Sequence, residues 1–567
     1  MKRSKLFLLL FTFLLLTSLS RGDFRYAVVV NNSTYQIPEW GLVADTLVSR
    51  YNGEIFIWQN STWDLRQDLI DYKPTHIAFV CEALTANSNF VQTSIWTLTR
   101  ALDDDPYGDA IWGIITGYNA ADALRLATCG SFRVKNMLGG TMSCDLGYYP
   151  QGICTSEGTY NRIRFKYLDG TIVDTTDEDL CPNDRTGFLM NMINADTIDI
   201  FMTSGHGNHD NWQLHYPTPD LEGFFRSNAG QLYGDPRYGS NINANSINPK
   251  IYLALGNCYV GKIQNLNSMA PAWIHTGGAS LMTGYVIPEG SDSYQHGGTK
   301  AYFARQGLYT WPEAFFLANQ ALYFDQIHHT PGTNPPDLNG SALYGDPALD
   351  ARLDTESGVI PGSMYDEQIE IVPGDTQDTV TVRIVMNRED YPGYNGKWGN
   401  RHPIVLFPFR AENPIIISYD PDCHSAMVTE EFLLMCIWHQ NEPPLPAGAV
   451  REFVFTCDHM TTSVEEPTAL SPVLPNGITL GQNYPNPFNA QTRIEYHLSS
   501  PMKINLAVYN LRGELVNTLF DGHQSEGTHN LIWDGRNNKG DEVVSGIYFY
   551  RLTSGDISES RSLLMLK

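Results

Sequence analysis

Over residues 26–352, short apolar runs alternate with amphipathic stretches, and this alternation constrains the fold more than any other feature of the chain. The apolar runs are rich in β-branched and aromatic residues, as buried strands are, whereas the stretches between them carry apolar residues at helical spacing. Strands that alternate with helices predict an α/β domain with a largely parallel sheet. The predicted strands are Tyr26–Val30, Glu54–Trp58, Thr75–Cys81, Thr197–Thr203, Lys250–Leu255 and Ala279–Thr283, and the predicted helices are Glu39–Tyr51, Trp63–Tyr72 and Met269–His275.

The pattern changes near Pro361, where polar and apolar residues begin to alternate with a period of two. Short strands separated by turn residues predict two small all-β sandwiches of the Ig-like kind, one on each side of a Pro-rich, acidic linker. The strands that indicate them are Thr379–Met386, Pro403–Phe409 and Pro414–Tyr419, then Thr492–Tyr496, Ile504–Tyr509 and Ile547–Leu552. The predicted parts of the chain are 1–22 (signal peptide), 23–355 (α/β domain), 356–462 (first sandwich), 463–477 (linker) and 478–567 (second sandwich).

The N-terminus has the three parts of a secretory signal. Lys2, Arg3 and Lys5 precede an apolar run, Leu6–Leu16, and small residues follow it. The run is shorter than the roughly 20 residues that span a bilayer, and no second long apolar stretch follows, so we expect no transmembrane helix. The chain has 62 carboxylates against 37 lysines and arginines. Such an acidic surface would repel phosphate backbones, so nucleic acid is not an expected partner.

The chain has nine cysteines, an odd number. In an oxidising compartment an odd count leaves one thiol unpaired, either for chemistry or for a disulfide with a partner. No two of them have the CxxC spacing, which argues against a zinc ribbon or a thioredoxin-like site. If Cys258 is the unpaired residue, the other eight could form up to four bridges, with at most one pair among Cys423, Cys436 and Cys457.

Two polar motifs follow predicted strands directly. One strand leads into Ser204-Gly205-His206-Gly207, and the next leads into Gly256-Asn257-Cys258. In an open parallel sheet functional groups gather beyond the carboxyl ends of the strands, so His206 and Cys258 can meet there if the strands are neighbours. A nearby imidazole favours the reactive thiolate and can protonate a leaving amine. The ordinary alternative is a buried cysteine or half of a disulfide beside a chance His-Gly pair.

These residues also resemble a family. A strand followed by His-Gly and then, 52 residues later, by a strand and Gly-Asn-Cys is similar to the caspase-like cysteine peptidases. Three segments narrow the resemblance to the gingipain-like branch, over about residues 24–353. They are DDPYGDAIWGIITG at Asp104–Gly117, SMAPAWIHTGGASLMTGY at Ser268–Tyr285 and ALYGDPAL at Ala342–Leu349.

The resemblance implies a caspase-fold cysteine endopeptidase. Cys258 would be the nucleophile, His206 the general base and acid, and the amides of Gly207 and Cys258 the oxyanion hole. Asp109 would orient the catalytic histidine, although it also reads as a solvated carboxylate in an acidic run. The sequence departs from the family's pattern at two places. Ile114 stands where the family usually has arginine, and Asn257 stands where small apolar residues are common.

Two other functions compete with this one. Gly207-Asn208-His209-Asp210, with His215 nearby, resembles the GNHD block of metallophosphatases, but the upstream half of a two-metal cage is missing. The second alternative is a non-catalytic, secreted binding or adhesion protein on the same fold. We therefore predict no catalytic metal and no cofactor, and leave a structural calcium ion open.

The C-terminal residues 478–567 resemble the type IX sorting domain of Bacteroidetes-related bacteria. The resemblance is carried by NYPNPFN at Asn483–Asn489, SGIYFY at Ser545–Tyr550 and a basic last residue, Lys567. It implies passage through the periplasm and outer membrane to the cell surface or medium, with the type IX secretion machinery as a partner. The substrates implied by the whole chain are proteins or peptides.

Overall fold

The computed structural model describes residues 24–246, 250–288, 293–330, 338–458 and, with short gaps, 478–566. It contains two compact units, residues 1–460 and 461–567, which we describe separately. The predicted signal peptide and linker lie outside the described residues. Among those described, no helix is both long and apolar enough to cross a bilayer.

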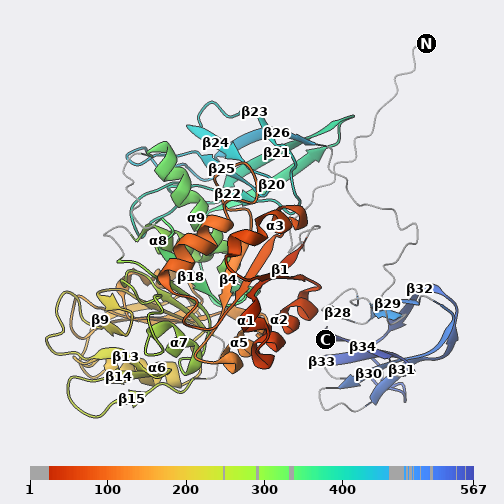
Figure 1. The fold of residues 1–567 in the computed structure, drawn as a ribbon, viewed down its shortest axis with the longest axis horizontal. Helices are drawn as coiled ribbons and strands as arrows, with labels where there is room; N and C mark the ends of the chain where they lie inside the picture. Colours follow the sequence, from red (N-terminus) through yellow and green to blue (C-terminus); the bar gives the residue numbers. More distant parts are fainter. Residues whose placement is uncertain are drawn as a thin grey trace. The chain divides into compact units, whose positions relative to one another are not determined.

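A mixed sheet of twelve strands organises the first unit (Figure 1). Its order is β2-β1-β3-β4-β18-β17-β16-β10-β6-β7-β8-β9, and eight of its eleven neighbouring pairs are parallel. The strands are β1 (Tyr26–Asn31), β2 (Glu54–Trp58), β3 (His76–Val80), β4 (Ile111–Ile115), β6 (Asn136–Gly139), β7 (Gln151–Thr155), β8 (Arg162–Lys166), β9 (Ile172–Thr176), β10 (Ile200–Thr203), β16 (Lys250–Ala254), β17 (Ala279–Tyr285) and β18 (Ser341–Tyr344).

The direction of the sheet reverses once near its middle. β18 is parallel to β4 but antiparallel to β17, so β1, β3 and β4 point one way while β10, β16 and β17 point the other. The carboxyl ends of β10 and β16 therefore share one edge of the sheet with the amino end of β4. The prediction of a largely parallel sheet is confirmed, and the reversal is a feature that the sequence pattern does not reveal.

Helices pack on this sheet where the sequence has apolar residues at helical spacing. The longest begins at a capping box, in which Thr310 and Glu313 satisfy each other's backbone amides. It is buried on nearly all sides, because it lies between the sheet and the next domain. The helices are α1 (Asn32–Tyr35), α2 (Pro38–Tyr51), α3 (Arg66–Tyr72), α4 (Trp96–Leu98), α5 (Ala120–Ala127), α6 (Thr186–Asn194), α7 (Met269–His275), α8 (Tyr294–Lys300) and α9 (Trp311–His328).

Two small sheets complete the α/β domain. A two-stranded sheet joins β5 to β19, and a five-stranded meander inserts between β10 and β16. This meander was not predicted, because its strands are short and bounded by polar turns. Their bounds are β5 (Phe132–Val134), β19 (Ala351–Leu353), β11 (Gly207–Asn208), β12 (Asn211–Gln213), β13 (Phe224–Asn228), β14 (Gln231–Asp235) and β15 (Ile242–Asn243).

Residues 365–458 form two antiparallel sheets that share one core. One has the order β20-β21-β26-β23 and the other β22-β25-β24. In β21 buried and partly exposed residues alternate, as the period-two pattern predicted. The strands are β20 (Tyr365–Val372), β21 (Gln377–Met386), β22 (Ile404–Leu406), β23 (Ile415–Tyr419), β24 (Ser425–Val428), β25 (Phe432–Cys436) and β26 (Val450–Asp458).

The second unit also consists of two sheets around a separate core, which includes the fully buried Trp533. Their orders are β27-β29-β32 and β28-β34-β33-β30-β31. The strands are β27 (Ile478–Leu480), β28 (Phe488–Asn489), β29 (Thr492–Leu498), β30 (Met502–Asn510), β31 (Leu515–Gln524), β32 (Gly527–Trp533), β33 (Gly546–Ser554) and β34 (Ile557–Leu566).

All nine cysteines lie in described residues. Cys144 and Cys154 form a disulfide, and the other seven are thiols. The prediction that Cys258 is not in a disulfide is confirmed, as is the limit of one pair among the three cysteines of the sandwich. The larger number of bridges that the count permitted does not form.

Removing the disulfide is expected to lower the free energy of unfolding by about 2–3 kcal/mol. The two cysteines are 10 residues apart, and closing a loop of that size in the unfolded chain has an entropic effect of this order. Urea unfolding of the Cys144→Ala/Cys154→Ala variant measures the difference. Unchanged stability of that variant would show that the bridge contributes nothing to the fold.

Candidate active site

The end of β10 and the end of β16 bring His206 and Cys258 to the same edge of the sheet. The two strands are parallel neighbours, with Thr203 opposite Ala254. His206 follows Thr203 by three residues and Cys258 follows Ala254 by four. The expected placement of both residues at the carboxyl ends of adjacent parallel strands is confirmed.

The backbone turns sharply beside both residues. Gly205 has φ +113°, and Tyr259 has φ 56°, a value that non-glycine residues adopt rarely. Gly207 packs against the cysteine turn, since a Cβ atom added there would lie 3.0 Å from Cβ of Asn257 and 3.1 Å from the carbonyl oxygen of Cys258. The close packing at Gly207 thus sets the histidine turn directly against the cysteine turn.

Exposure distinguishes Cys258 from the other thiols. Cys258 is half-buried and His206 is exposed, whereas the six other thiols are buried. Burial raises the pKa of Cys81 and of Cys423 to about 12, and the pKa of Cys181 and of Cys457 to about 11. Those four side chains are therefore neutral thiols near pH 7, which are poor nucleophiles.

Asn257, which the sequence comparison treated as a departure from the family pattern, has a structural role. It is fully buried, and its amide nitrogen donates to the hydroxyl of Thr203 at 2.7 Å, while its oxygen accepts from the indole of Trp212 at 3.0 Å. Thr203 ends β10, and Trp212 belongs to the hairpin after His206. One side chain thus joins the cysteine turn to both sides of the histidine turn. The polarity of Asn257 beside two apolar strands is the sequence signal that could have pointed to this role.

Tyr216 is a residue near the site that the sequence did not single out. Its ring centroid lies 4.9 Å from that of His206, and its amide donates to the carbonyl of Glu157 at 2.8 Å. A Cβ atom at Gly205 would lie 3.7 Å from Cβ of Tyr216. The tyrosine therefore packs on the imidazole and restricts its orientation.

Asp109 lies elsewhere on the same edge. It precedes β4, and four strand spacings of about 4.8 Å separate β4 from β10, which is roughly 19 Å. Its carboxylate accepts from the amide of Leu102 at 2.9 Å and lies beside Asp103 and Glu431. None of the contacts described for Asp109 involves His206. This geometry does not support the orienting role predicted for Asp109.

Asp103, Asp109 and Glu431 form an acidic cluster between the α/β domain and the sandwich. One oxygen of each lies within 4.8 Å of the others, and no other group of three metal-ligand residues is this close in the described part of the chain. Carboxylate oxygens are the ligands that calcium prefers. Arg410 pairs with Glu431 at 3.2 Å. Burial and the neighbouring carboxylates raise the pKa of Asp109 well above its usual range and the pKa of Glu431 to about 8.

We expect the free energy of unfolding to fall between about pH 5 and pH 9 because of this cluster. A folded-state pKa of about 8 for Glu431 is above the roughly 4.3 of an unfolded glutamate, so the folded state binds the proton more tightly. The stability linked to that proton is fully present below the unfolded pKa and is lost as pH rises through the folded pKa. Melting temperatures measured over this range with EDTA check it. In Glu431→Gln the melting temperature should depend less on pH than in the wild type. An equal fall in the two proteins would contradict the assignment of this pH dependence to Glu431.

The residues of the GNHD block do not gather into a metal site. His209 is hydrogen-bonded to the side chain of Asn208 at 3.0 Å, and His215 is buried against the ring of Tyr160 at 4.0 Å. Together with Asp210 they are outside the single ligand cluster found among the described residues. The geometry gives no support to the metal-hydrolase alternative.

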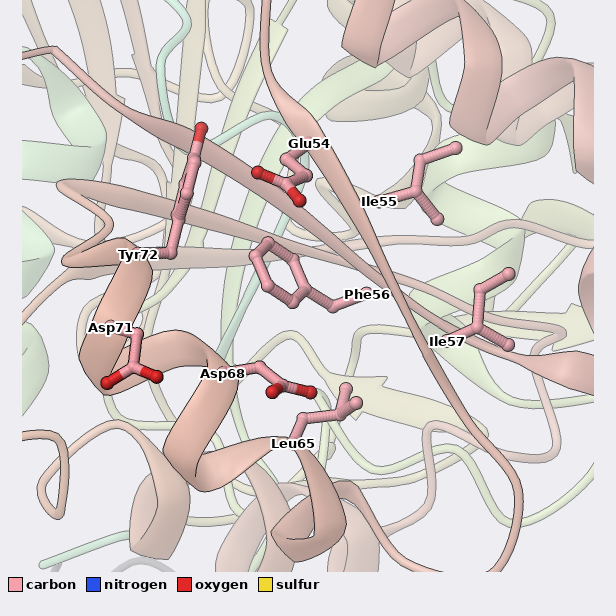
Figure 2. A pocket seen from close by; sticks show the side chains of 8 residues that line it. All are labelled: Glu54, Ile55, Phe56, Ile57, Leu65, Asp68, Asp71 and Tyr72. Atoms are coloured by element: carbon pink, nitrogen blue, oxygen red, sulfur yellow. The ribbon is translucent and has the colours of Figure 1, made fainter.

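A surface depression of about 480 Å³ lies at an edge of the sheet (Figure 2), several strands from β10 and β16 and so away from His206 and Cys258. It is formed by β2, the outermost strand of the sheet, and by α3. Carboxylates of Glu54, Asp68 and Asp71 border it around Phe56. It holds no cysteine, histidine or cation, so we do not assign the chemistry of the chain to it.

The C-terminal strands match a known family. Residues 486–556 match the FlgD Ig-like domain. The second predicted Ig-like sandwich is thereby supported, whereas an Ig-like assignment for residues 356–462 stays a prediction. A search of curated protein sequences finds no match.

Solved structures share a more distant likeness with the chain. Gingipain R, an Arg-specific cysteine proteinase, is 8% identical with a TM-score of 0.41, covering 97% of this chain and 100% of its own. Latent dimeric PorU of Porphyromonas gingivalis is 10% identical with a TM-score of 0.23, over 95% of this chain and 64% of its own. FlgD of P. aeruginosa is 21% identical with a TM-score of 0.11, over 13% and 57%. Because these TM-scores are below 0.5, we take the fold from the strand pairings alone.

Proposed function

We propose that the chain is a secreted cysteine endopeptidase, with Cys258 as nucleophile and His206 as general base and acid. The observation that supports this proposal is that His206 and Cys258 follow the carboxyl ends of the adjacent parallel strands β10 and β16. Cys258 is half-buried and His206 is exposed, so both side chains are open to a substrate, and acyl transfer requires an imidazole that takes up the thiol proton.

The reaction divides into two steps. Sγ of Cys258 attacks the carbonyl carbon of the peptide bond while its proton passes to His206, and the carbonyl oxygen becomes an oxyanion. The amides of Gly207 and Cys258 are the proposed donors to that oxyanion. His206 then protonates the departing amine and a thioester remains. Water, deprotonated by His206, hydrolyses the thioester and restores the thiol.

The tail of the protein is proposed to serve export. Residues 478–567 contain the motifs that resemble a type IX sorting domain, and the Ig-like match falls within them. We infer that the chain crosses the inner membrane by its signal peptide and reaches the cell surface or medium through the type IX machinery. The Cys144–Cys154 disulfide supports an oxidising compartment.

A thiol-reactive peptide probe, such as a peptidyl acyloxymethyl ketone, tests the assignment. Cys258 should be labelled in the native protein, and digestion followed by mass spectrometry identifies the labelled residue. The six buried thiols are internal controls, because they should react only after denaturation. A protein whose Cys258 is not labelled by any such peptide would instead be a binding or adhesion protein.

A further inference from the structure

A loop of the sandwich domain, residues 391–402, extends onto helix α8 of the α/β domain. Arg401 anchors it, since its Nη2 donates to the carbonyl oxygens of Tyr294 at 2.9 Å and of Lys397 at 3.1 Å. The guanidinium lies over the rings of Tyr294 and Tyr394 at 4.1 and 5.0 Å, and these two rings stack at 5.3 Å. We call this segment the bridging loop. Its buried arginine fixes it to the α/β domain.

Two further contacts fix the position of Trp398 within the bridging loop. A Cβ atom at Gly297 of α8 would lie 1.9 Å from the carbonyl oxygen of Lys397, so only glycine allows this approach. Arg305 donates to the carbonyl of Trp398 at 3.1 Å and to the side chain of Asn400 at 2.8 Å. The α/β domain therefore holds the backbone at Lys397 and Trp398, while Asn400 also donates to Asp390 of the sandwich at 3.0 Å.

The indole of Trp398 reaches the candidate active site. A Cβ atom added at Gly256 would lie 3.2 Å from Cη2 of Trp398, 3.2 Å from Oγ of Ser204 and 3.4 Å from Oγ of Ser293. Gly256 is two residues before Cys258, and Ser204 is two residues before His206. The ring thus lies over the turns that carry both proposed catalytic residues. Trp398 is half-buried, so part of its surface remains open to a ligand.

We propose that Trp398 forms a wall of the subsite for the substrate side chain immediately before the cleaved bond, and that it selects large apolar or planar side chains there. The inference rests on the proposed peptidase function. Attack by Cys258 requires the substrate carbonyl within about 3–3.5 Å of Sγ, so the side chain of that residue lies among the groups flanking the cysteine. Because Gly256 has no side chain, the indole can lie this close to the cysteine turn, and its half-buried ring offers a large apolar surface there.

Peptides that differ only in the residue before the cleaved bond, phenylalanine or alanine, test the proposal by hydrolysis. Trp398→Ala should lower kcat/KM for the phenylalanine peptide by about 10- to 100-fold, as loss of a large apolar contact does. The value of kcat/KM for the alanine peptide should change by about threefold at most. Trp398→Phe should retain most of the preference. Tyr391→Ala is the matched control, because it truncates an exposed aromatic residue of the same loop whose described ring contact is with Trp438.

Equal losses on both peptides, or no loss on either, would overturn the role of Trp398. A binding measurement, which needs no turnover, distinguishes failure of the subsite proposal from failure of the proposed peptidase function. In the Cys258→Ser background, calorimetry with the two peptides should show tighter binding of the phenylalanine peptide, and Trp398→Ala should remove that difference. A wild-type protein that binds selectively through Trp398 but cleaves nothing would refute the peptidase and keep the subsite. Binding that is indifferent to Trp398 would refute the subsite.

Discussion

Replacing His206 with alanine is expected to lower peptide hydrolysis by a factor on the order of 10² or more, because proton transfer to and from the reacting groups is lost. Cys258→Ser should cost at least as much, since a hydroxyl is a far weaker nucleophile than a thiolate at neutral pH. Initial rates on a fluorogenic peptide, with each variant checked for folding by circular dichroism, measure both effects.

His209→Ala is the matched control for His206→Ala. The side chain of His209 contacts Asn208, and its hydrogen bond with Met269 is made by the backbone carbonyl. The substitution should therefore leave the fold and the contacts of His206 and Cys258 unchanged. We expect its rate to stay within about threefold of wild type, which is far from the effect of removing a proton-transfer group. Loss of activity in His209→Ala or on adding a chelator, together with activity in Cys258→Ser, would overturn the assignment in favour of a metal hydrolase.

Breaking the buried ion pair of Arg185 and Glu222 should destabilise the protein by about 3–5 kcal/mol, because an uncompensated charge then stays in the interior. The two side chains are 2% and 0% exposed. Arg185 also donates to the hydroxyl of Thr155 at 2.9 Å and to the carbonyl oxygens of Gly140 and Leu214. Arg185→Leu therefore removes one partner from a fully desolvated network. Urea unfolding followed by tryptophan fluorescence measures the loss.

Arg226→Leu is the control for that variant, because the pair that Arg226 forms with Asp235 is 35% and 37% exposed. Exposed pairs contribute at most about 1 kcal/mol. A second comparison, Arg185→Leu/Glu222→Leu, should recover much of the stability by removing both charges. Activity should fall with Arg185→Leu as well, since Leu214 belongs to the segment between the hairpin after His206 and Tyr216. Equal stability of the Arg185 and Arg226 variants would contradict this account.

The α/β pattern of the sequence was enough to locate the strands that carry the dyad. β2 and α7 have the predicted bounds, and β10 and β16 lie within one or a few residues of theirs. Periodicity works here because these strands are buried on both faces and read as continuous apolar runs. The rule that polar groups gather beyond carboxyl ends of parallel strands then placed His206 with Cys258.

The sequence was a poorer guide wherever the outcome depends on contacts between distant segments. Asp109 has the local signature of an orienting acid, yet strand order puts it several strands away, beside Glu431 from another domain. Tyr216 contacts His206 but lies in no motif of the sequence, and Asn257 stood out only as a departure from the family pattern, not for the contacts that it makes. The count of nine cysteines allowed four bridges, whereas the structure has one, between Cys144 and Cys154.

By itself the sequence located β1, β2, β3, β10, β16 and β17, the change to β structure near Pro361, and the motifs that contain His206 and Cys258 at the ends of β10 and β16. These follow from hydrophobic periodicity and from motifs at strand ends, which are local properties. Only the tertiary structure decided that the sheet reverses at β17 and β18, that the meander lies between His206 and Cys258, and that Trp398 approaches Gly256 from the sandwich. Those outcomes depend on the packing of segments separated by up to some 140 residues, which no local pattern encodes.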